Sequence, residues 1–211
     1  MQIKENVKKI FSEIPKNVKV LAATKNQNPE KIKQAVNAGI RVIGENIVQD
    51  AEKKFSEFDF EVGKHFIGHL QSNKAKKAVE LFDCIQSVDS LKLAGKIDSA
   101  CSGINKKMPV FIELNLGENQ KFGVKKEEIL TIAEGISRMN FLELKGLMFI
   151  APFFEQPEKS VPFFSEAGKV FFELKNSFAS VEVLSMGMST DFVFAVKNKS
   201  NMIRIGKKIF S

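Results

Sequence analysis

Lys25 is the first residue whose type and place suggest chemistry, because it follows an apolar run at residues 19–24. Ala22 and Ala23 come shortly before it and leave room for a ligand beside the lysine. Partial desolvation at the end of a strand would favour an uncharged amine, which can form a Schiff base with an aldehyde. The alternative is an ordinary surface lysine, since most basic residues of this chain are lysines.

Ser185, Gly187 and Ser189 form a second polar group, between a strand-like run and a helix-like segment. Their hydroxyl and backbone N–H groups can bind a phosphate, and the dipole of a following helix favours the negative charge. The pattern therefore predicts a phosphate site.

Arg204 and Gly206 close the last strand-like run, in which isoleucines flank the arginine on both sides. A cation in an apolar strand needs a partner, which is either a carboxylate of the protein or a ligand. We favour a ligand because the predicted phosphate loop precedes this run. A Schiff-base lysine, a phosphate loop and a fixed cation match the aldehyde, phosphate and ring nitrogen of pyridoxal 5′-phosphate.

The two histidines, His65 and His69, are four residues apart, a spacing that raises the question of a metal site. No glutamate follows the first histidine, so the metalloprotease pattern is absent. Cys84 and Cys101 lack the spacing of paired metal ligands and are expected in or near the core. We expect no metal site, and the scarcity of cysteine favours the cytoplasm.

The composition excludes several classes of function. The chain has no Tyr and no Trp among its 211 residues, so no phenol can act as a general acid or base. A net charge of +7 suggests anionic partners. However, arginine forks and aromatic stacking, which nucleic-acid readers use, are scarce, and we expect a solvated basic surface without nucleic-acid binding. The longest apolar stretch, residues 146–154, is too short to span a bilayer, and we expect no membrane association.

Strand-like runs alternate with helix-like segments along the whole chain and predict the architecture that positions these residues. The runs are residues 19–24, 40–44, 65–68, 84–88, 110–115, 144–149, 181–186 and 202–206. Eight such units predict an α/β fold, a closed (β/α)₈ TIM-type barrel in a single domain over residues 1–211. A helix with Ile3, Val7 and Ile10 on one face should precede it. An open doubly wound sheet is the alternative, although the Gly-x-Gly-x-x-Gly fingerprint is absent.

The polar motifs at the predicted strand ends resemble, in order and over nearly the whole chain, those of one family. These are the pyridoxal phosphate homeostasis proteins of the YggS/PROSC type, which are related to the N-terminal barrel of alanine racemase. The matching segments are residues 22–25, 44–49, 65–74, 145–148, 184–189 and 204–206.

The resemblance implies a barrel that binds pyridoxal phosphate as a Schiff base on Lys25. It implies that Ser185, Gly187, Ser189 and Gly206 line the phosphate site, that Arg204 faces the pyridine nitrogen, and that Asn46 lies beside the ring. Taken without the resemblance, Gly44-Glu45-Asn46 either positions a ligand or caps a helix. The chain departs from the family at Ile47, where an aromatic residue is usual. It also ends at Ser211, where a glycine usually follows the preceding phenylalanine.

These residues favour a carrier over a catalyst. An arginine, with an ordinary pKa above about 12, does not give a proton to the pyridine nitrogen, which weakens the ring as an electron sink. A racemase also needs a group on each face of the α-carbon, and no tyrosine is present. We expect a monomer that buffers pyridoxal phosphate and delivers it to apo-enzymes. The alternatives are a small pyridoxal-phosphate-dependent amino-acid racemase and a barrel that recruits a protein or nucleic acid through its lysines.

Overall fold

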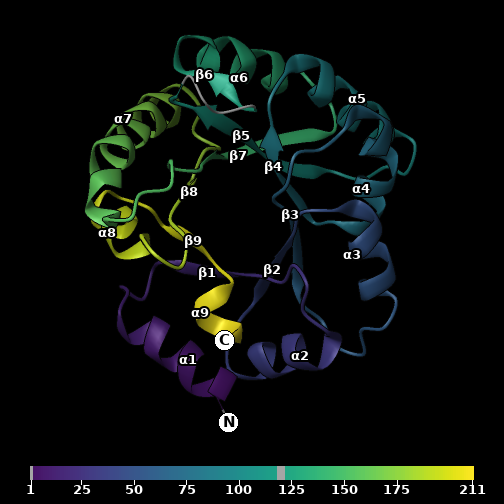
Figure 1. The fold of residues 1–211 in the computed structure, drawn as a ribbon. Coiled ribbons are helices and arrows are strands. Elements are labelled where there is room, and N and C mark those ends of the chain that lie inside the picture. Colours follow the sequence, from purple (N-terminus) through teal and green to yellow (C-terminus); the bar gives the residue numbers. More distant parts are fainter. Residues whose placement is uncertain (1, 118–121) are drawn as a thin grey trace.

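The eight apolar runs form a closed barrel of parallel strands (Figure 1), and the alternative of an open sheet is wrong. The structure, a computed structural model, describes residues 2–117 and 122–211. Within these residues the barrel strands are β1 Lys19–Ala23, β2 Val42–Glu45, β3 Gly63–Phe66, β4 Cys84–Val88, β5 Met108–Asn115, β7 Leu142–Phe149, β8 Val183–Ser185 and β9 Met202–Ile205. They pair in the order β4-β3-β2-β1-β9-β8-β7-β5, and β4 pairs with β5 to close the ring. The two-residue strand β6, Val124–Lys125, pairs with the end of β5.

Helices cover the outside of the barrel on all sides (Figure 1). They are α1 Gln2–Ser12, α2 Pro29–Asn37, α3 Val48–Phe55, α4 Ala75–Leu81, α5 Leu91–Ser102, α6 Ile129–Ser137, α7 Val161–Ser177, α8 Phe192–Lys197 and α9 Lys207–Phe210, with 3₁₀ turns η1 Ser72–Lys74, η2 Lys126–Glu128 and η3 Pro157–Ser160. The additional helix α1 is present, as predicted. It lies against α9, where the Asn6 side chain donates a hydrogen bond of 3.0 Å to the carbonyl of Ile209.

Helix α2 shows how the sequence sets the start and end of an element. Asn28 caps the helix, because its side chain accepts a hydrogen bond of 3.0 Å from the Lys31 backbone N–H. Pro29 follows as the first helical residue, where its missing N–H costs nothing. Gly39 ends the segment with φ +117°, a conformation that a β-carbon disfavours. The chain is thereby directed into β2.

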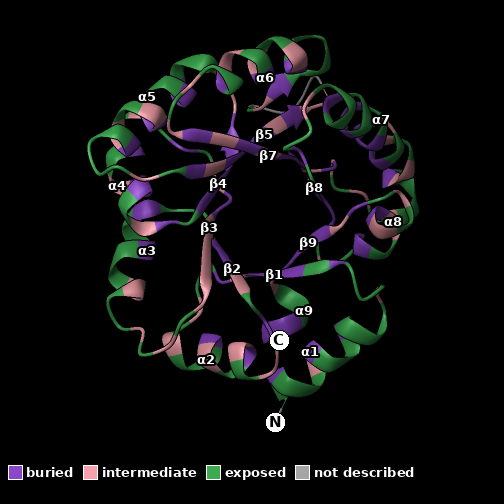
Figure 2. Ribbon diagram, turned by 180° about the vertical axis from the view of Figure 1, so that it is seen from behind, coloured by how far each residue is buried: buried purple, intermediate pink, exposed green. Residues whose placement is uncertain are grey.

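Buried residues lie along the barrel strands and on the surrounding helices (Figure 2), and their apolar side chains form two separate layers. The outer layer lies between the strands and the surrounding helices and contains most of the buried residues. The inner layer fills the barrel itself with Leu21, Ile67, Cys84, Phe111, Met148 and Met202. Because side chains alternate along a strand, Arg204 on β9 faces the same side as Met202 and lies one step nearer the carboxyl end. The barrel interior thus changes from apolar to polar towards its carboxyl end.

Within the residues described here, no helix is long and apolar enough to cross a membrane.

Candidate functional site

Lys25 lies two residues beyond the end of β1, in a turn at the carboxyl end of the barrel. The strand ends at Ala23, and Asn26 then takes a left-handed conformation with φ 61°, so the chain turns sharply. The side chain of Lys25 is exposed. The partial desolvation that the sequence predicted for its amine is therefore wrong for this structure, because the lysine has left the strand.

Thr24 precedes Lys25 and is completely buried. Its hydroxyl donates a hydrogen bond of 2.6 Å to Glu45, the last residue of β2. Lys54 on α3 donates to the carbonyl of Thr24 at 2.7 Å and forms an ion pair with Glu45. We refer to Thr24, Glu45 and Lys54 as the Thr24 clamp.

Asn46 lies just beyond β2 and is exposed. Gly68, which follows β3, packs directly against its backbone: a β-carbon at Gly68 would come within 2.3 Å of the Asn46 carbonyl oxygen. The lack of a side chain at Gly68 therefore allows the two loops to meet. The side chain of Asn46 caps no helix, and the residue at the start of α3 is Ile47, which is 43% exposed and makes no side-chain capping bond.

Arg204 is 4% exposed and lies inside the barrel. Its Nη1 donates to the carbonyl of Ser185 at 2.7 Å and to its hydroxyl at 2.8 Å, and Nη2 donates to the Phe149 carbonyl at 2.8 Å. Burial lowers the pKa of Arg204 to about 10, and the charges of Glu113 and Asp191 oppose that shift. The guanidinium stays charged at neutral pH, although its pKa is lower than the ordinary arginine value that the sequence analysis assumed.

Ser185 links Arg204 by hydrogen bonds to side chains on the other side of the barrel interior. A guanidinium can only donate, so the Ser185 hydroxyl accepts from Arg204 and donates to the Gln86 side-chain oxygen, at 2.7 Å. The Gln86 nitrogen then faces His65 Nδ1 at 2.8 Å and must donate to it. Burial lowers the pKa of His65 to about 4, so the ring is neutral and can accept this bond. The four side chains form one directed chain from β9 through β8 and β4 to β3.

Glu113 on β5 brings a carboxyl group to the same interior. Burial raises its pKa to about 7, and Asp89 adds to the increase, whereas Arg204 opposes it. The group is therefore poised near neutral pH. It is a titratable neighbour of Arg204 that the sequence analysis did not identify.

The loop after β8 has the close packing expected of a ligand loop. Gly187 is buried with φ +96°, and a β-carbon there would lie 2.6 Å from the β-carbon of Ala195. Asp191 accepts a hydrogen bond of 2.6 Å from the Met188 backbone N–H and fixes the loop on the start of α8. The Ser189 hydroxyl lies 3.4 Å from the Lys208 backbone N–H, so this loop meets α9.

Every residue that the sequence nominated follows or ends one of four strands that are neighbours in the ring. Asn46 follows β2 and Lys25 follows β1, while Arg204 lies near the end of β9 and Gly206 follows it. The remaining residues, Ser185, Gly187 and Ser189, end or follow β8. Ser185 and Arg204 are in direct contact, and Ser189 contacts the helix that Gly206 precedes. The nominated residues thus occupy one continuous arc of the barrel mouth.

Sequence reasoning did not nominate Gln86 and Glu113 inside the barrel, nor Lys54 on α3. It considered His65 only as a metal ligand, and Glu45 only together with Gly44 and Asn46. Glu113 interrupts an apolar strand just as Arg204 does, so the argument applied to Arg204 would have found it. Gln86 gives a weaker signal of the same kind within β4. The pairing of Lys54 with Glu45 joins a helix to a strand, and no local pattern reveals it.

The two histidines have separate environments and do not share a ligand site. His65 is bonded to Gln86 inside the barrel, whereas His69 stacks on the exposed ring of Phe122, with centroids 3.6 Å apart. The described part of the chain contains no group of three or more metal-ligating side chains. Both cysteines are free and buried, as predicted.

The groups present fit the chemistry of pyridoxal 5′-phosphate. Lys25 offers an accessible primary amine, and Arg204 offers a buried guanidinium with N–H groups beyond the three bonds above. Ser189 offers a hydroxyl to a phosphate. Gly206 lets the chain after β9 approach the end of β1 closely, because a β-carbon there would come within 3.1 Å of the Ala23 carbonyl oxygen. The donors suit an aldehyde, a ring nitrogen and a phosphate, respectively.

Comparison with known proteins supports the same assignment. The model of the family "Alanine racemase, N-terminal domain" matches residues 1–211. A pyridoxal phosphate homeostasis protein of Vibrio alginolyticus is 34% identical over 99% of this chain and 96% of its own length. The protein of the same name from Helicobacter pylori is 37% identical over 92% of this chain and 87% of its own length.

Solved structures agree on the fold. PipY from Synechococcus elongatus PCC7942, solved with pyridoxal phosphate bound, is 33% identical, has a TM-score of 0.93, and covers all of both chains. Alanine racemase of Clostridium difficile, in complex with cycloserine, has a TM-score of 0.81 at 13% identity. This chain covers 58% of that enzyme, and the likeness concerns the fold alone.

Proposed function

The chain belongs to the pyridoxal phosphate homeostasis proteins, within the alanine racemase N-terminal domain family, and we propose that it holds pyridoxal 5′-phosphate on Lys25 and passes it to apo-enzymes. The observation that carries the proposal is the arc of the mouth over β2, β1, β9 and β8, neighbouring strands that carry or precede an amine, a buried cation and a loop with hydroxyl groups. Pyridoxal phosphate has an aldehyde, a ring nitrogen and a phosphate, so a binding site needs three different protein groups close together.

Lys25 supplies the covalent link. Its uncharged amine nitrogen forms a C=N bond to the aldehyde carbon, and its two protons leave with the carbonyl oxygen as water. The step needs neither oxidant nor reductant, and it is reversible by water or by another amine. A reversible link to an exposed lysine suits a protein that releases its cargo.

Arg204 holds the pyridine nitrogen by a hydrogen bond and keeps its own proton. The pKa of its guanidinium, about 10, leaves it charged at neutral pH. A pyridine nitrogen beside this cation stays largely unprotonated, and the bound cofactor, which elsewhere acts as an electron sink, is then a poor one. Ser185 and Phe149 fix the orientation of the guanidinium.

The phosphate site takes Ser189, Gly187 and Gly206. Ser189 lies close to the Lys208 backbone N–H, so a phosphate bound at its hydroxyl would reach both loops. The hydroxyl of Ser185 is already engaged by Gln86 and Arg204. We therefore give Ser185 the task of orienting Arg204, while Asn46 lies beside the cofactor ring.

We further propose that the protein acts as a monomeric single-domain barrel over residues 1–211, in the cytoplasm, and turns over little or no amino acid. Two cysteines, both free, support a reducing compartment. The second candidate, a small amino-acid racemase, is favoured by one observation. Glu113, with a pKa of about 7, is a titratable acid inside the barrel that could act as a proton donor or acceptor.

Borohydride reduction followed by peptide mass spectrometry tests the proposal. The expected result is a reduced pyridoxal phosphate adduct on the peptide that contains Ala23-Thr24-Lys25, and loss of imine absorbance in Lys25→Ala. Lys74→Ala and Lys207→Ala serve as controls and should keep the adduct. An adduct on another lysine, or unchanged imine absorbance in Lys25→Ala, would overturn the assignment.

A further inference from the structure

Thr24 is held at every polar group by its surroundings. Its N–H donates to the Gly44 carbonyl at 3.0 Å, and its hydroxyl donates to Glu45 at 2.6 Å. Its carbonyl accepts from the Gln27 N–H at 3.0 Å and from Lys54 Nζ at 2.7 Å. Two of these four partners are charged side chains that are themselves paired.

The ion pair of the Thr24 clamp is buried, unlike another ion pair that involves α3. The side chains of Lys54 and Glu45 are 11% and 2% exposed. For Lys77 and Glu52, a pair that also involves α3, the values are 40% and 51%. Desolvation of a buried pair offsets much of its Coulomb attraction, so such a pair adds little net stability. What it supplies is a fixed geometry.

That geometry is imposed one residue before Lys25. The Lys25 side chain is exposed, and within the described residues it has no hydrogen-bond or ion-pair partner. The position of the Lys25 amine therefore depends on the position of the Lys25 backbone, which follows Thr24. The Thr24 clamp sets that starting point from the ends of β1 and β2 and from α3.

We propose that Glu45 and Lys54 are positioning residues that fix the Thr24 backbone so that the Lys25 amine is presented for imine formation. The inference rests on the proposed function, in which Lys25 forms the Schiff base. Correct orientation of a reacting amine raises its effective concentration, and displacement of about 1 Å can cost a large factor in rate.

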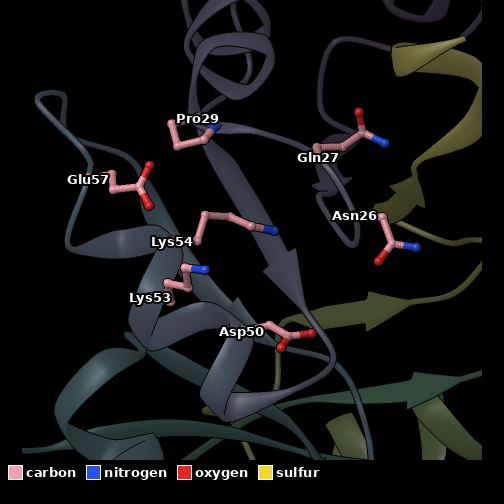
Figure 3. A pocket seen from close by; sticks show the side chains of 7 residues that line it. All are labelled: Asn26, Gln27, Pro29, Asp50, Lys53, Lys54 and Glu57. Carbon is pink, nitrogen blue, oxygen red and sulfur yellow. The ribbon is translucent and has the colours of Figure 1, made fainter.

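The surroundings of Lys54 allow the clamp to be tested without crowding. Figure 3 shows Lys54 extending from α3 towards the loop that carries Asn26 and Gln27. It lines an open pocket of ≈ 280 Å³ with these residues and Asp50. A methionine, which is similar in length and unbranched, therefore fits at position 54.

Two sets of variants separate the clamp from general stability. Glu45→Leu combined with Lys54→Met removes both charges together, so neither is left buried alone. Thr24→Val removes the hydroxyl at nearly constant shape, whereas Thr24→Ser keeps it. Glu52 lies on α3, as Lys54 does, and Glu52→Gln breaks its exposed ion pair with Lys77 of α4; this variant is the matched control.

The first readout is imine formation with two aldehydes, pyridoxal phosphate and unphosphorylated pyridoxal, followed by absorbance and by the rate of borohydride trapping. In the double variant and in Thr24→Val, we expect the rate of imine formation to fall roughly ten- to a hundred-fold, and equally with both aldehydes. Thr24→Ser and Glu52→Gln should stay within about threefold of the parent protein. Equal loss with both aldehydes marks an effect on the amine, since a phosphate-site defect would spare pyridoxal.

The second readout needs no cofactor. Amide hydrogen exchange over residues 24–28 should become faster in the double variant and in Thr24→Val. The melting temperature of the double variant should stay unchanged. In Glu52→Gln the exchange rate should stay unchanged. A folded double variant that forms the imine at the parent rate with both aldehydes would overturn the inference, as would a loss confined to pyridoxal phosphate. If the parent protein carried no adduct on Lys25, the proposed function would fail, whereas exchange over residues 24–28 would still report whether the clamp orders this turn.

Discussion

Arg204 donates to both oxygens of Ser185, at 2.7 Å to the carbonyl and 2.8 Å to the hydroxyl. The hydroxyl in turn donates to Gln86, so it links a buried cation on β9 to an amide on β4. Such a network orients each member only when all its bonds are made. Ser185 is thus the residue through which the barrel interior controls the direction of Arg204.

Ser185→Ala should remove this link. The change leaves the Gln86 oxygen without its donor and frees one N–H of Arg204, and each unsatisfied buried group costs about 1–3 kcal/mol. We expect the free energy of unfolding of the cofactor-free protein to fall by about 2 kcal/mol, and pyridoxal phosphate to bind more weakly. Urea unfolding and equilibrium dialysis measure the two effects. Unchanged stability would mean that the hydroxyl is dispensable to the network.

Ser189→Ala should act on the phosphate alone. Removal of a hydrogen bond to a charged group costs about 1–3 kcal/mol, so binding of pyridoxal phosphate should weaken by about that amount. Binding of unphosphorylated pyridoxal should hardly change. Ser137→Ala, which removes a surface hydroxyl on α6, is the control. Equal losses for the two ligands would place Ser189 outside the phosphate site.

His65 and Glu113 should give opposing contributions to the pH dependence of stability. Burial lowers the pKa of His65 from 6.5 to about 4, so the unfolded chain binds its proton first as the pH falls, and stability is lost between about 6.5 and 4. Burial raises the pKa of Glu113 from 4.5 to about 7, so the folded chain binds this proton first, and stability is gained as the pH falls from about 7 to 4.5.

Single variants should separate these two terms. Relative to the parent protein, His65→Asn should become more stable as the pH falls from 7 to 4.5, because the variant lacks the His65 term. Relative to the parent protein, Glu113→Gln should become less stable over the same range, because the variant lacks the Glu113 term. Each slope is at most about 1.4 kcal/mol per pH unit. Urea unfolding of the parent and of both variants at several pH values measures these differences, and differences of the same sign would contradict the prediction.

The barrel could be predicted from sequence because its signals are local. The alternation of apolar runs and amphipathic segments, and the Asn28-Pro29 start of α2, depend on neighbouring residues only. Strand ends depend on more distant residues. β3 occupies Gly63–Phe66, where the runs predicted 65–68, because Gly63 pairs with Val42 and the chain leaves the strand before Gly68. Pairing with β2 decides that boundary, and the paired residues lie 21 positions apart in the sequence.

The contacts within the site could be predicted only in part. Arg204 was found because a charge in an apolar strand is conspicuous, but its partner Ser185 was assigned to the phosphate. The burial of Lys25 was misjudged because the turn at Asn26 breaks the strand periodicity. The Glu45–Lys54 pair depends on how α3 packs against the ends of β1 and β2, and the sequence carries no short-range sign of it.

Gly187→Ala should destabilise the loop after β8. The residue has φ +96°, and a β-carbon would lie 2.6 Å from that of Ala195, so both backbone strain and overlap oppose the change. We expect a loss of about 1–3 kcal/mol and weaker pyridoxal phosphate binding. Gly95→Ala is the matched control, because nothing lies within 4 Å of its added carbon and the residue is within α5. That variant should gain about 0.5–1 kcal/mol, and a loss in Gly95→Ala equal to that in Gly187→Ala would refute the argument.

The protein should racemise L-alanine slowly or not at all. The chain contains no tyrosine, so the second face of the α-carbon lacks that acid or base, and loss of such a group costs about 10²–10⁴-fold. Arg204 lowers the ceiling further by leaving the pyridine nitrogen unprotonated. Optical activity of L-alanine with the cofactor-loaded protein measures turnover, and light scattering measures its mass, expected to be that of a monomer. Glu113→Gln is the informative variant, because any residual turnover that depends on this carboxyl should disappear in it. If the protein were a dimer that turned over alanine at about 10 s⁻¹, an ordinary enzyme rate, the carrier proposal would be wrong and the racemase proposal would take its place.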